Sequence, residues 1–336
     1  MATAAEIDLS LIVEWENTHH AGASRTQEMF TRLSRQLLDY TSTRAISVEL
    51  IVAYDSSDCD EDSIRALVGA CWDDAQSVAP LRLVAAPRAS YYMLKNRAAV
   101  EARGVLVAFI DCDVLPEADW LKCILEPFSD PSVGAVQGVT RVDPKSALER
   151  GLAVAWLFPF LTAQGELSEK GRVIANNVAF RRSVLLRHPY PALRSWRGQC
   201  TAQRRSLDAA GIVVVWSRGA CTIHPFPEGL AGTVERAFLN GHDHLLRYEA
   251  AGGARRCWKA TWWRYRSFVR RARRRRRLLD LTPTEVVACE IVARFYWGCA
   301  ALSEIMVHLA PRLWRRLLRE LPAEDPVAAT VPSHTS

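Results

Sequence analysis

The chain has 336 residues, of which 49% are hydrophobic and 24% charged, and a net charge of +6. This length allows one large domain or two smaller ones, and the composition is ordinary for a soluble globular protein. The positive charge is local, because residues 254–277 hold twelve Arg or Lys and no acid, which leaves the rest of the chain at −6.

Targeting and redox features point to one compartment. The N-terminus has no basic region followed by an apolar one, so we expect no secretory signal. The nine cysteines are an odd count without a C-x-x-C pair, which argues against a disulfide framework or a zinc site. We find no apolar stretch long enough to span a bilayer, and we expect a cytoplasmic protein.

Strand and helix patterns alternate through about the first 115 residues. Short apolar runs predict strands over 8–14, 48–53, 81–85 and 105–110, and helical spacing or turn signals predict helices over 24–40, 60–72 and 96–103. This alternation predicts an α/β fold with a doubly wound, mostly parallel sheet and helices on its faces. The middle region is less regular, with strands expected over 133–139, 173–180, 212–216 and 220–224, an apolar segment over 156–161 and a short helix over 203–210.

The C-terminal region predicts a helical extension. Thr282, Pro283 and Glu285 form a capping-box start, and the helix that follows runs to about His308. Its wide apolar face needs a partner, which we expect to be the main domain or a second copy of the chain rather than lipid. We therefore expect a nucleotide-sugar-binding domain over 1–245, a basic and amphipathic extension over 246–321, and a disordered tail over 322–336.

The strand at 105–110 ends in a pair of carboxylates. Its six apolar residues suit a strand covered on both faces, and in extended chain Asp111 and Asp113 point to one side while Cys112 points away. Ligands of open α/β sheets bind outside the carboxyl ends of the strands, where two carboxylates suit a hard divalent cation. The alternative is that this short motif is only a turn or a helix cap.

Four segments now line up in order along the chain: Glu14-Trp-Glu-Asn17, Tyr54-Asp-Ser-Ser-Asp58, Lys95-Asn-Arg-Ala-Ala99 and Asp111-Cys-Asp113. Together they resemble the nucleotide-binding half of the family-2 glycosyltransferases. The resemblance continues at Asn177-Val-Ala-Phe-Arg-Arg-Ser183, Gly198-Gln-Cys-Thr201, Leu207-Asp-Ala-Ala-Gly211 and His224, and it covers about residues 8–230. It implies a GT-A type fold, and a metal-dependent enzyme that moves a sugar from a nucleotide diphospho-sugar to an acceptor, with inversion.

The resemblance also implies a metal site. A metal that bridges the diphosphate stabilises the charge of the leaving group. Asp113 is the first choice as a direct ligand of Mn²⁺ or Mg²⁺, Asp111 is a direct or water-mediated ligand, and His224 completes the set. The alternative for His224, which precedes a proline, is a satisfied and partly buried histidine.

Four further residues are candidates for binding the nucleotide. The resemblance implies contact of Asp55 with the base, and Glu14 sits where the base or ribose would lie. Lys95 and Arg97, at the start of a helix, can meet phosphate oxygens. The alternatives are that Asp55 caps the helix at 60 onward, and that Lys95 and Arg97 form a solvated face.

The chain departs from the family where a general base is expected. The family has a Glu-Asp pair at the positions of Gln199 and Cys200, and the Asp removes the proton of the acceptor hydroxyl. Cys200 is a weak candidate, because a buried thiol is normally inert. The base can come from elsewhere, with Asp208, Asp243 and His242 as guesses. Otherwise the acceptor is already an anion, or the protein binds nucleotide sugar without turnover as a scaffold.

The arginine-rich segment over 254–277 has three interpretations. It is a solvated helix face, a binding surface for an anionic membrane at the inner, cytoplasmic side, or a nucleic-acid footprint. Nucleic acid is the least favoured, because no recognisable nucleic-acid-binding fold accompanies the run. The acceptor (lipid-linked, a saccharide or a small molecule) and any homo-oligomer are not fixed by the sequence.

Overall fold

The computed structural model describes residues 7–16, 18, 22–146, 149–150, 152–153, 173–193, 195, 197–226, 229–249, 259, 262–263, 266, 281–310 and 313–314. The chain divides into two compact units. Unit 1 comprises Met1–Lys145, Trp156–Tyr190 and Cys200–Phe226, and unit 2 comprises Ser146–Ala155, Pro191–Gln199 and Pro227–Ser336. Helix α9 (Gly229–Glu249) therefore belongs to unit 2, although most of it falls within the expected 1–245 domain.

The first half of unit 1 is a parallel sheet. Strands β1 (Ile7–Glu14), β2 (Val48–Tyr54), β3 (Leu81–Ala85) and β4 (Gly104–Asp111) lie in the order β3-β2-β1-β4 and all run parallel. Helices α2 (Ala23–Thr43), α3 (Glu61–Trp72) and α4 (Tyr91–Glu101) connect them. This confirms the predicted alternation of strand and helix.

The second half extends the same sheet and makes it mixed. It adds β7 (Asn177–Arg181), β6 (Val133–Arg141), β8 (Val213–Ile223) and β5 (Leu115–Pro116), in that order beyond β4. Strand β7 is antiparallel to β4 and β6, β8 is parallel to β6, and β5 is antiparallel to β8. Among the strands described, β5 and β7 thus oppose the other six, so the prediction of a mostly parallel α/β sheet is confirmed.

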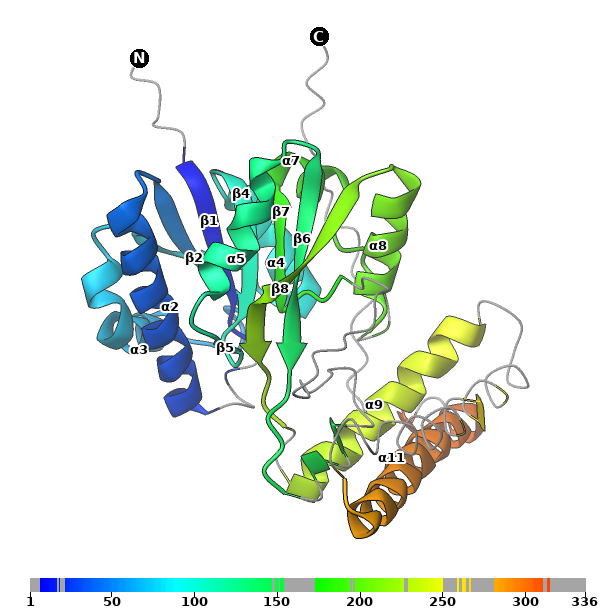
Figure 1. Ribbon diagram of the computed structural model, residues 1–336. Coiled ribbons are helices and arrows are strands. Elements are labelled where there is room, and N and C mark those ends of the chain that lie inside the picture. The colour runs from blue at the N-terminus through cyan, green and yellow to red at the C-terminus, as the bar shows by residue number, and fades with distance from the viewer. Residues whose placement is uncertain are drawn as a thin grey trace. The chain divides into compact units, whose positions relative to one another are not determined.

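Helices cover both faces of the sheet. Neighbouring residues of a strand point to opposite faces, so each strand contributes to two separate cores. Leu9, Leu11 and Val13 of β1 join a core with residues of α2, α3 and α5 (Trp120–Leu125). Ile12 joins a second core with residues of α4, α7 (Arg182–Arg187) and α8 (Gln199–Ala209). Figure 1 shows these layers. Short 3-10 helices at Asp73–Ala75 and Glu126–Ser129 extend α3 and α5.

Several element boundaries differ from the sequence prediction. Helix α4 begins at Tyr91 with Ser90 as N-cap, five residues before the expected start, and α8 begins at Gln199 rather than at 203. The two strands expected over 212–224 form one strand, β8. The polar residues Ser217–Gly219 lie at a shift in its register with β6, between the pairs Trp216–Gln137 and Cys221–Val139. Strand β7 begins at Asn177 rather than at 173.

Unit 2 contains α9 and the long helix α11 (Pro283–Leu309), whose predicted start is confirmed. Thr282 Oγ1 accepts from the Glu285 N–H at 3.3 Å, and the Thr282 N–H donates to Glu285 Oε2 at 2.8 Å. In the part of the chain described here, α11 is long and apolar enough over Pro283–Val307 to cross a membrane by length and composition, which corrects our finding of no such stretch. Residues 156–161, 322–336 and most of 254–277 lie outside the described residues.

Candidate functional site

Two buried carboxylates face each other at the carboxyl ends of β1 and β4. The register of this parallel pair places Glu14 opposite Asp111, and both side chains are buried. Strand β1 connects through α2 to β2 on one side, whereas β4 lies on its other side, so the strand order reverses between β1 and β4. In open α/β sheets the crevice outside such a switch point is where ligands bind.

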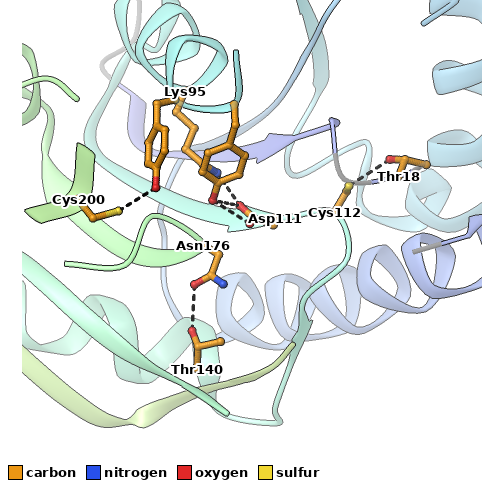
Figure 2. Close-up of polar contacts among 9 residues, drawn as sticks. Thr18, Lys95, Asp111, Cys112, Thr140, Asn176 and Cys200 are labelled. Carbon is orange, nitrogen blue, oxygen red and sulfur yellow. Dashed lines mark hydrogen bonds and ion pairs between the residues drawn. The ribbon is translucent and has the colours of Figure 1, made fainter. Parts of the chain in front are cut away.

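A fully buried lysine compensates the charge of Asp111. Lys95 of α4 is 0% exposed, and its Nζ lies 2.6 Å from Asp111 Oδ1 (Figure 2). Tyr91, in the first turn of the same helix, donates its hydroxyl to both Asp111 oxygens at 2.8 and 3.0 Å. The ammonium also lies over the rings of Tyr91 and Phe109, 4.5 and 5.4 Å from their centroids. The early start of α4 puts Lys95 in the second turn of the helix, not at its N-terminus.

Two glutamates beside this ion pair bind protons more tightly than usual. Burial, followed by the charge of Asp111, raises the pKa of Glu14 well above 4.5. The same two causes raise the pKa of Glu16 to about 7, although the charge of Lys95 and a hydrogen bond from the Tyr91 backbone N–H oppose the shift. The other Glu16 oxygen, Oε2, is buried and has no hydrogen-bond partner among the described residues.

The turn after β4 differs from the extended chain that we expected. Strand β4 ends at Asp111, and the Val114 N–H donates to the Asp111 carbonyl at 3.2 Å, so Cys112 and Asp113 belong to a turn. The Cys112 sulfur lies 3.1 Å from Thr18 Oγ1 (Figure 2), and burial, followed by the charges of Glu14 and Asp113, raises the pKa of this thiol. Asp113 is 2% exposed.

The pairing of β5 with β8 brings His224 to the same turn. Leu115 lies opposite Ile223 in this antiparallel pair, so Asp113 and His224 flank the same end of it. Arg25 of α2 bridges the two segments, donating to the Asp113 carbonyl at 2.5 Å and to the Ile223 carbonyl at 2.9 Å. His224 is 6% exposed and its Nδ1 donates to the Pro225 carbonyl at 2.7 Å, which leaves Nε2 as the ring nitrogen that can bind a metal.

These residues carry donor atoms that suit a divalent cation, but they are not grouped around one point as ligands of a metal ion are. Carboxylate oxygens and an imidazole acceptor nitrogen are suitable donors. Both Asp111 oxygens already accept hydrogen bonds, however, and among the described residues no three His, Cys, Asp or Glu side chains are grouped so as to hold a metal ion. A cation here would depend on Asp113 and His224, with phosphate or water oxygens as its other ligands.

Asp55 positions a loop at the edge of the site. Its Oδ1 accepts from the backbone N–H groups of Ser57 and Arg88 at 2.8 and 2.7 Å. Arg88 has a positive φ of 58°, a conformation that this hydrogen bond helps to hold. The alternative that Asp55 caps α3 is wrong, because Asp60 is the N-cap and accepts from the Ser63 N–H at 3.0 Å.

Arg97 is separated from Lys95 by its orientation on the helix. It is exposed and pairs with Glu101 one turn later, at 3.2 Å. This is the solvated arrangement named above as the alternative for Arg97, whereas Lys95 is fully buried and does not follow it.

The segment at 199–200 contains no activated base. Burial raises the pKa of the Cys200 thiol, whose sulfur lies 3.4 Å from the Tyr92 hydroxyl, so the thiol stays neutral near pH 7. Gln199 donates its amide to the Ser195 carbonyl at 2.7 Å. Of the other guesses, Asp208 pairs with Arg204 on an exposed part of α8, and His242 and Asp243 are buried on α9 of unit 2.

The sequence did not single out Tyr91, Glu16 or Arg25. Tyr91 lies before the helix expected over 96–103, so no pattern placed it near Asp111. Glu16 carried a weak signal, since it follows Glu14 at the two-residue spacing that we noted for Asp111 and Asp113. Arg25 reaches the site from across more than 80 residues of chain, and no local pattern marks such a contact.

Comparisons with known proteins give similarity in structure only. No protein-family model and no curated protein matches the sequence. A mannosyltransferase from Pyrobaculum calidifontis, solved with GDP-Man and Mn²⁺, is 18% identical, with 94% of this chain and 85% of that chain covered and a TM-score of 0.47. Glucosyl-3-phosphoglycerate synthase from Mycobacterium tuberculosis, solved with Mn²⁺, UDP-Glc and phosphoglyceric acid, is 14% identical, with 74% and 82% covered and a TM-score of 0.48. Similarity at this level leaves function to the residues at the strand ends.

Proposed function

We propose that unit 1 is a glycosyltransferase that binds a nucleotide diphospho-sugar at the carboxyl ends of β1 and β4 and transfers the sugar to an acceptor. The observation that supports this most strongly is the pairing of Glu14 and Asp111 at the switch point of the sheet, with Lys95 buried against Asp111. A ligand that enters this crevice meets oxygen donors, a histidine nitrogen and a preorganised charge, as a nucleotide diphosphate with its cation requires.

The residues take different parts in this proposal. Asp113 and His224 would hold a divalent cation, Mn²⁺ or Mg²⁺, with Asp111 as a direct or water-mediated ligand. Such a cation, when bound, neutralises the charge that develops on the departing diphosphate. Lys95 and Tyr91 fix the orientation of Asp111, so that little reorganisation is needed when the ligand binds. Asp55 and Glu14 face the nucleoside, and Asp55 also holds the Arg88 loop.

The proton of an acceptor hydroxyl needs a base other than Cys200. A neutral thiol cannot accept a proton in the transition state, where a base is typically worth about 10²–10⁴ in rate. An acceptor that is already anionic, such as a phosphate or carboxylate, needs none. The proposal therefore predicts a preference for anionic acceptors over neutral sugars.

The test combines binding with turnover. The thermal unfolding midpoint of the full chain is measured with UDP, GDP, TDP and CDP, each with and without Mn²⁺, and we expect one nucleotide to stabilise the protein only with the metal. Hydrolysis of the matching nucleotide sugar should then be lost in Asp113→Ala and kept in Asp119→Ala, which removes an exposed acid six residues away. Stabilisation without any turnover, with anionic acceptors included, would identify a binding protein instead, and no stabilisation by any nucleotide would contradict both.

A further inference from the structure

Helix α11 presents a continuous apolar stripe to the outside of unit 2. Its exposed large apolar residues are Val287, Ile291, Phe295, Leu302 and Leu309. Their spacing of four or seven residues places them on one side of the helix, within roughly 80°. The stripe from 287 to 309 is about 33 Å long at 1.5 Å per residue. The exposed fraction reaches 59% at Ile291 and 77% at Leu309, so this stripe is no part of the core.

The opposite side of α11 packs on α9, and its buried residues are mostly small: Cys289, Ala293, Ala300 and Ser303. Ser303 donates its hydroxyl to the Phe238 carbonyl of α9 at 2.7 Å, and Glu304 is 2% exposed. The two helices approach closely where Gly241 meets Ala300, since a Cβ on Gly241 would lie 2.1 Å from the Ala300 oxygen. Figure 1 shows α9 and α11 side by side. Helix α11 thus buries small side chains together with Ser303 and Glu304, and it exposes large apolar ones, which a helix of a water-soluble protein normally buries.

Basic and aromatic residues accompany the stripe in the same unit. Residues 254–277 hold twelve Arg or Lys and no acid and precede α11 by a few residues. Within this segment the described Trp262 and Trp263 are 60% and 69% exposed, and Lys259 and Arg266 are exposed as well. Tryptophan next to Arg and Lys is the combination enriched at the boundary between lipid head groups and acyl chains.

We propose that unit 2 docks this protein on an anionic phospholipid bilayer, with α11 lying parallel to the membrane plane and its apolar stripe among the acyl chains. The basic segment 254–277 would meet the phosphate head groups, which supplies the charge complementarity. A membrane-spanning α11 is disfavoured because this helix is packed closely on α9, which would have to enter the bilayer with it. Among the helices described, only α11 is long and apolar enough to span, so α9 would carry Glu235 and Arg236 into the hydrocarbon.

Two other partners fit the same surface less well. A second copy of the chain would bring a second set of twelve basic residues to the interface, and like charges repel. Nucleic acid would account for the arginines but gives no reason for an exposed stripe of large apolar side chains. An anionic bilayer accounts for both features at once.

The experiment is co-sedimentation of the full chain with vesicles of phosphatidylcholine, with and without about 30% phosphatidylglycerol. We expect binding only to the anionic vesicles, weakened by salt because the Arg-rich segment contributes to it. The double variant Ile291→Ser/Phe295→Ser should bind on the order of tenfold or more weakly, since both side chains would leave the acyl region. The matched control is Val100→Ser, an equally exposed apolar residue on α4 of unit 1, which should bind as the parent does.

A second variant and two further measurements keep the proposal falsifiable. Replacing Arg273–Arg277 with glutamine should abolish the preference for anionic vesicles while the folded state, checked by circular dichroism, is retained. Failure of the parent chain to sediment with anionic vesicles overturns the proposal, as does equal loss of binding in the Val100→Ser control. A lipid-free dimer by light scattering that the Ile291→Ser/Phe295→Ser variant dissociates would assign the stripe to a second copy instead. Retention on membranes after an alkaline carbonate wash would overturn the in-plane orientation.

Discussion

Lys95 carries a positive charge at a position that solvent does not reach. Removing an ammonium and a carboxylate from water costs several kcal/mol for each, and their attraction repays this only when further hydrogen bonds satisfy them. The Tyr91 hydroxyl supplies one such bond, shared between the two Asp111 oxygens, and the Tyr91 and Phe109 rings lie against the ammonium. Removing one partner of such a buried pair strongly destabilises the protein, so the contribution of the pair to stability can be measured.

Lys95→Met should lower the free energy of unfolding by about 3–5 kcal/mol, because Asp111 would remain buried without its partner. Urea denaturation measures the change, and the control is Arg97→Met, an exposed pair on the same helix that should change the midpoint little. Adding Asp111→Asn to Lys95→Met should recover part of the loss. A single variant as stable as Arg97→Met would show that the pair is not buried as described.

Glu16 should make stability depend on pH. Its pKa is about 7 in the folded protein and ordinarily 4.5, so the unfolded chain loses its proton first as the pH rises. Stability is then lost between about pH 4.5 and 7, by up to about 3 kcal/mol. Glu16→Gln cannot ionise and should gain on the parent chain over this window, reaching a constant difference above pH 7.

The thermal midpoint of both proteins between pH 4.5 and 8 tests this, with Glu28→Gln as an exposed control that pairs with Arg32. A difference between parent and Glu16→Gln that stays constant with pH would contradict the raised pKa.

At the scale of elements, β4 and β1 come unusually close at Gly104. A Cβ at this position would lie 2.4 Å from the Ser10 nitrogen and 2.7 Å from Leu106 O, both of them backbone atoms that cannot rotate away. Hydrogen bonds hold the two strands together at the same place. The Ser10 hydroxyl donates to Glu49 Oε1 at 2.6 Å and accepts from the Gly104 N–H at 2.9 Å. The beginning of β4 is thereby set against β1, and the register that brings Asp111 opposite Glu14 follows from it.

Gly104→Ala should destabilise the protein by about 1–3 kcal/mol, as overpacking against backbone does. Gly69→Ala is the matched control, since Gly69 lies in the interior of α3 with nothing within 4 Å of its added Cβ. It should stabilise by about 0.5–1 kcal/mol through helix propensity. Chemical denaturation of both variants gives opposite signs if the close approach is real, and equal shifts if it is not.

Helices and strands with a clear hydrophobic periodicity were predictable from the sequence, but the residues at which they begin and end were not. The apolar runs of β1, β2 and β4 and the capping box of α11 gave correct elements, because these signals lie within a few residues of the chain. Helix α4 is also tied to a distant segment, because Asn96 and Tyr190 exchange hydrogen bonds of 2.7 and 3.0 Å across 94 residues. A contact between segments so far apart in the chain cannot be predicted from a local sequence pattern.

At the scale of the whole molecule, the two proposed surfaces belong to different units. The nucleotide site uses β1, β4 and α4 of unit 1, and the membrane surface uses α11 and the basic segment of unit 2. Hydrogen exchange should therefore show two separate footprints. The stabilising nucleotide with Mn²⁺ should slow exchange at the ends of β1 and β4, and anionic vesicles should slow it in α11.

Each ligand alone is measured against the free full chain, and neutral vesicles serve as the control for the second. Protection of α11 by nucleotide alone, or of β4 by vesicles alone, would contradict this assignment of one ligand to each unit.

Local sequence patterns were enough to predict that a buried strand ends at Asp111, that a mostly parallel sheet surrounds it, and that α11 has an apolar face. These follow from periodicity and apolar runs, which act over a few residues. These patterns did not predict that Glu14 lies opposite Asp111, that Lys95 neutralises Asp111, or that α11 buries Ser303 and Glu304, all of which depend on the folded chain. Strand register and the choice of helix face are set by contacts between distant segments, and the pKa of Glu16 follows from the burial and the neighbouring charge that those contacts create.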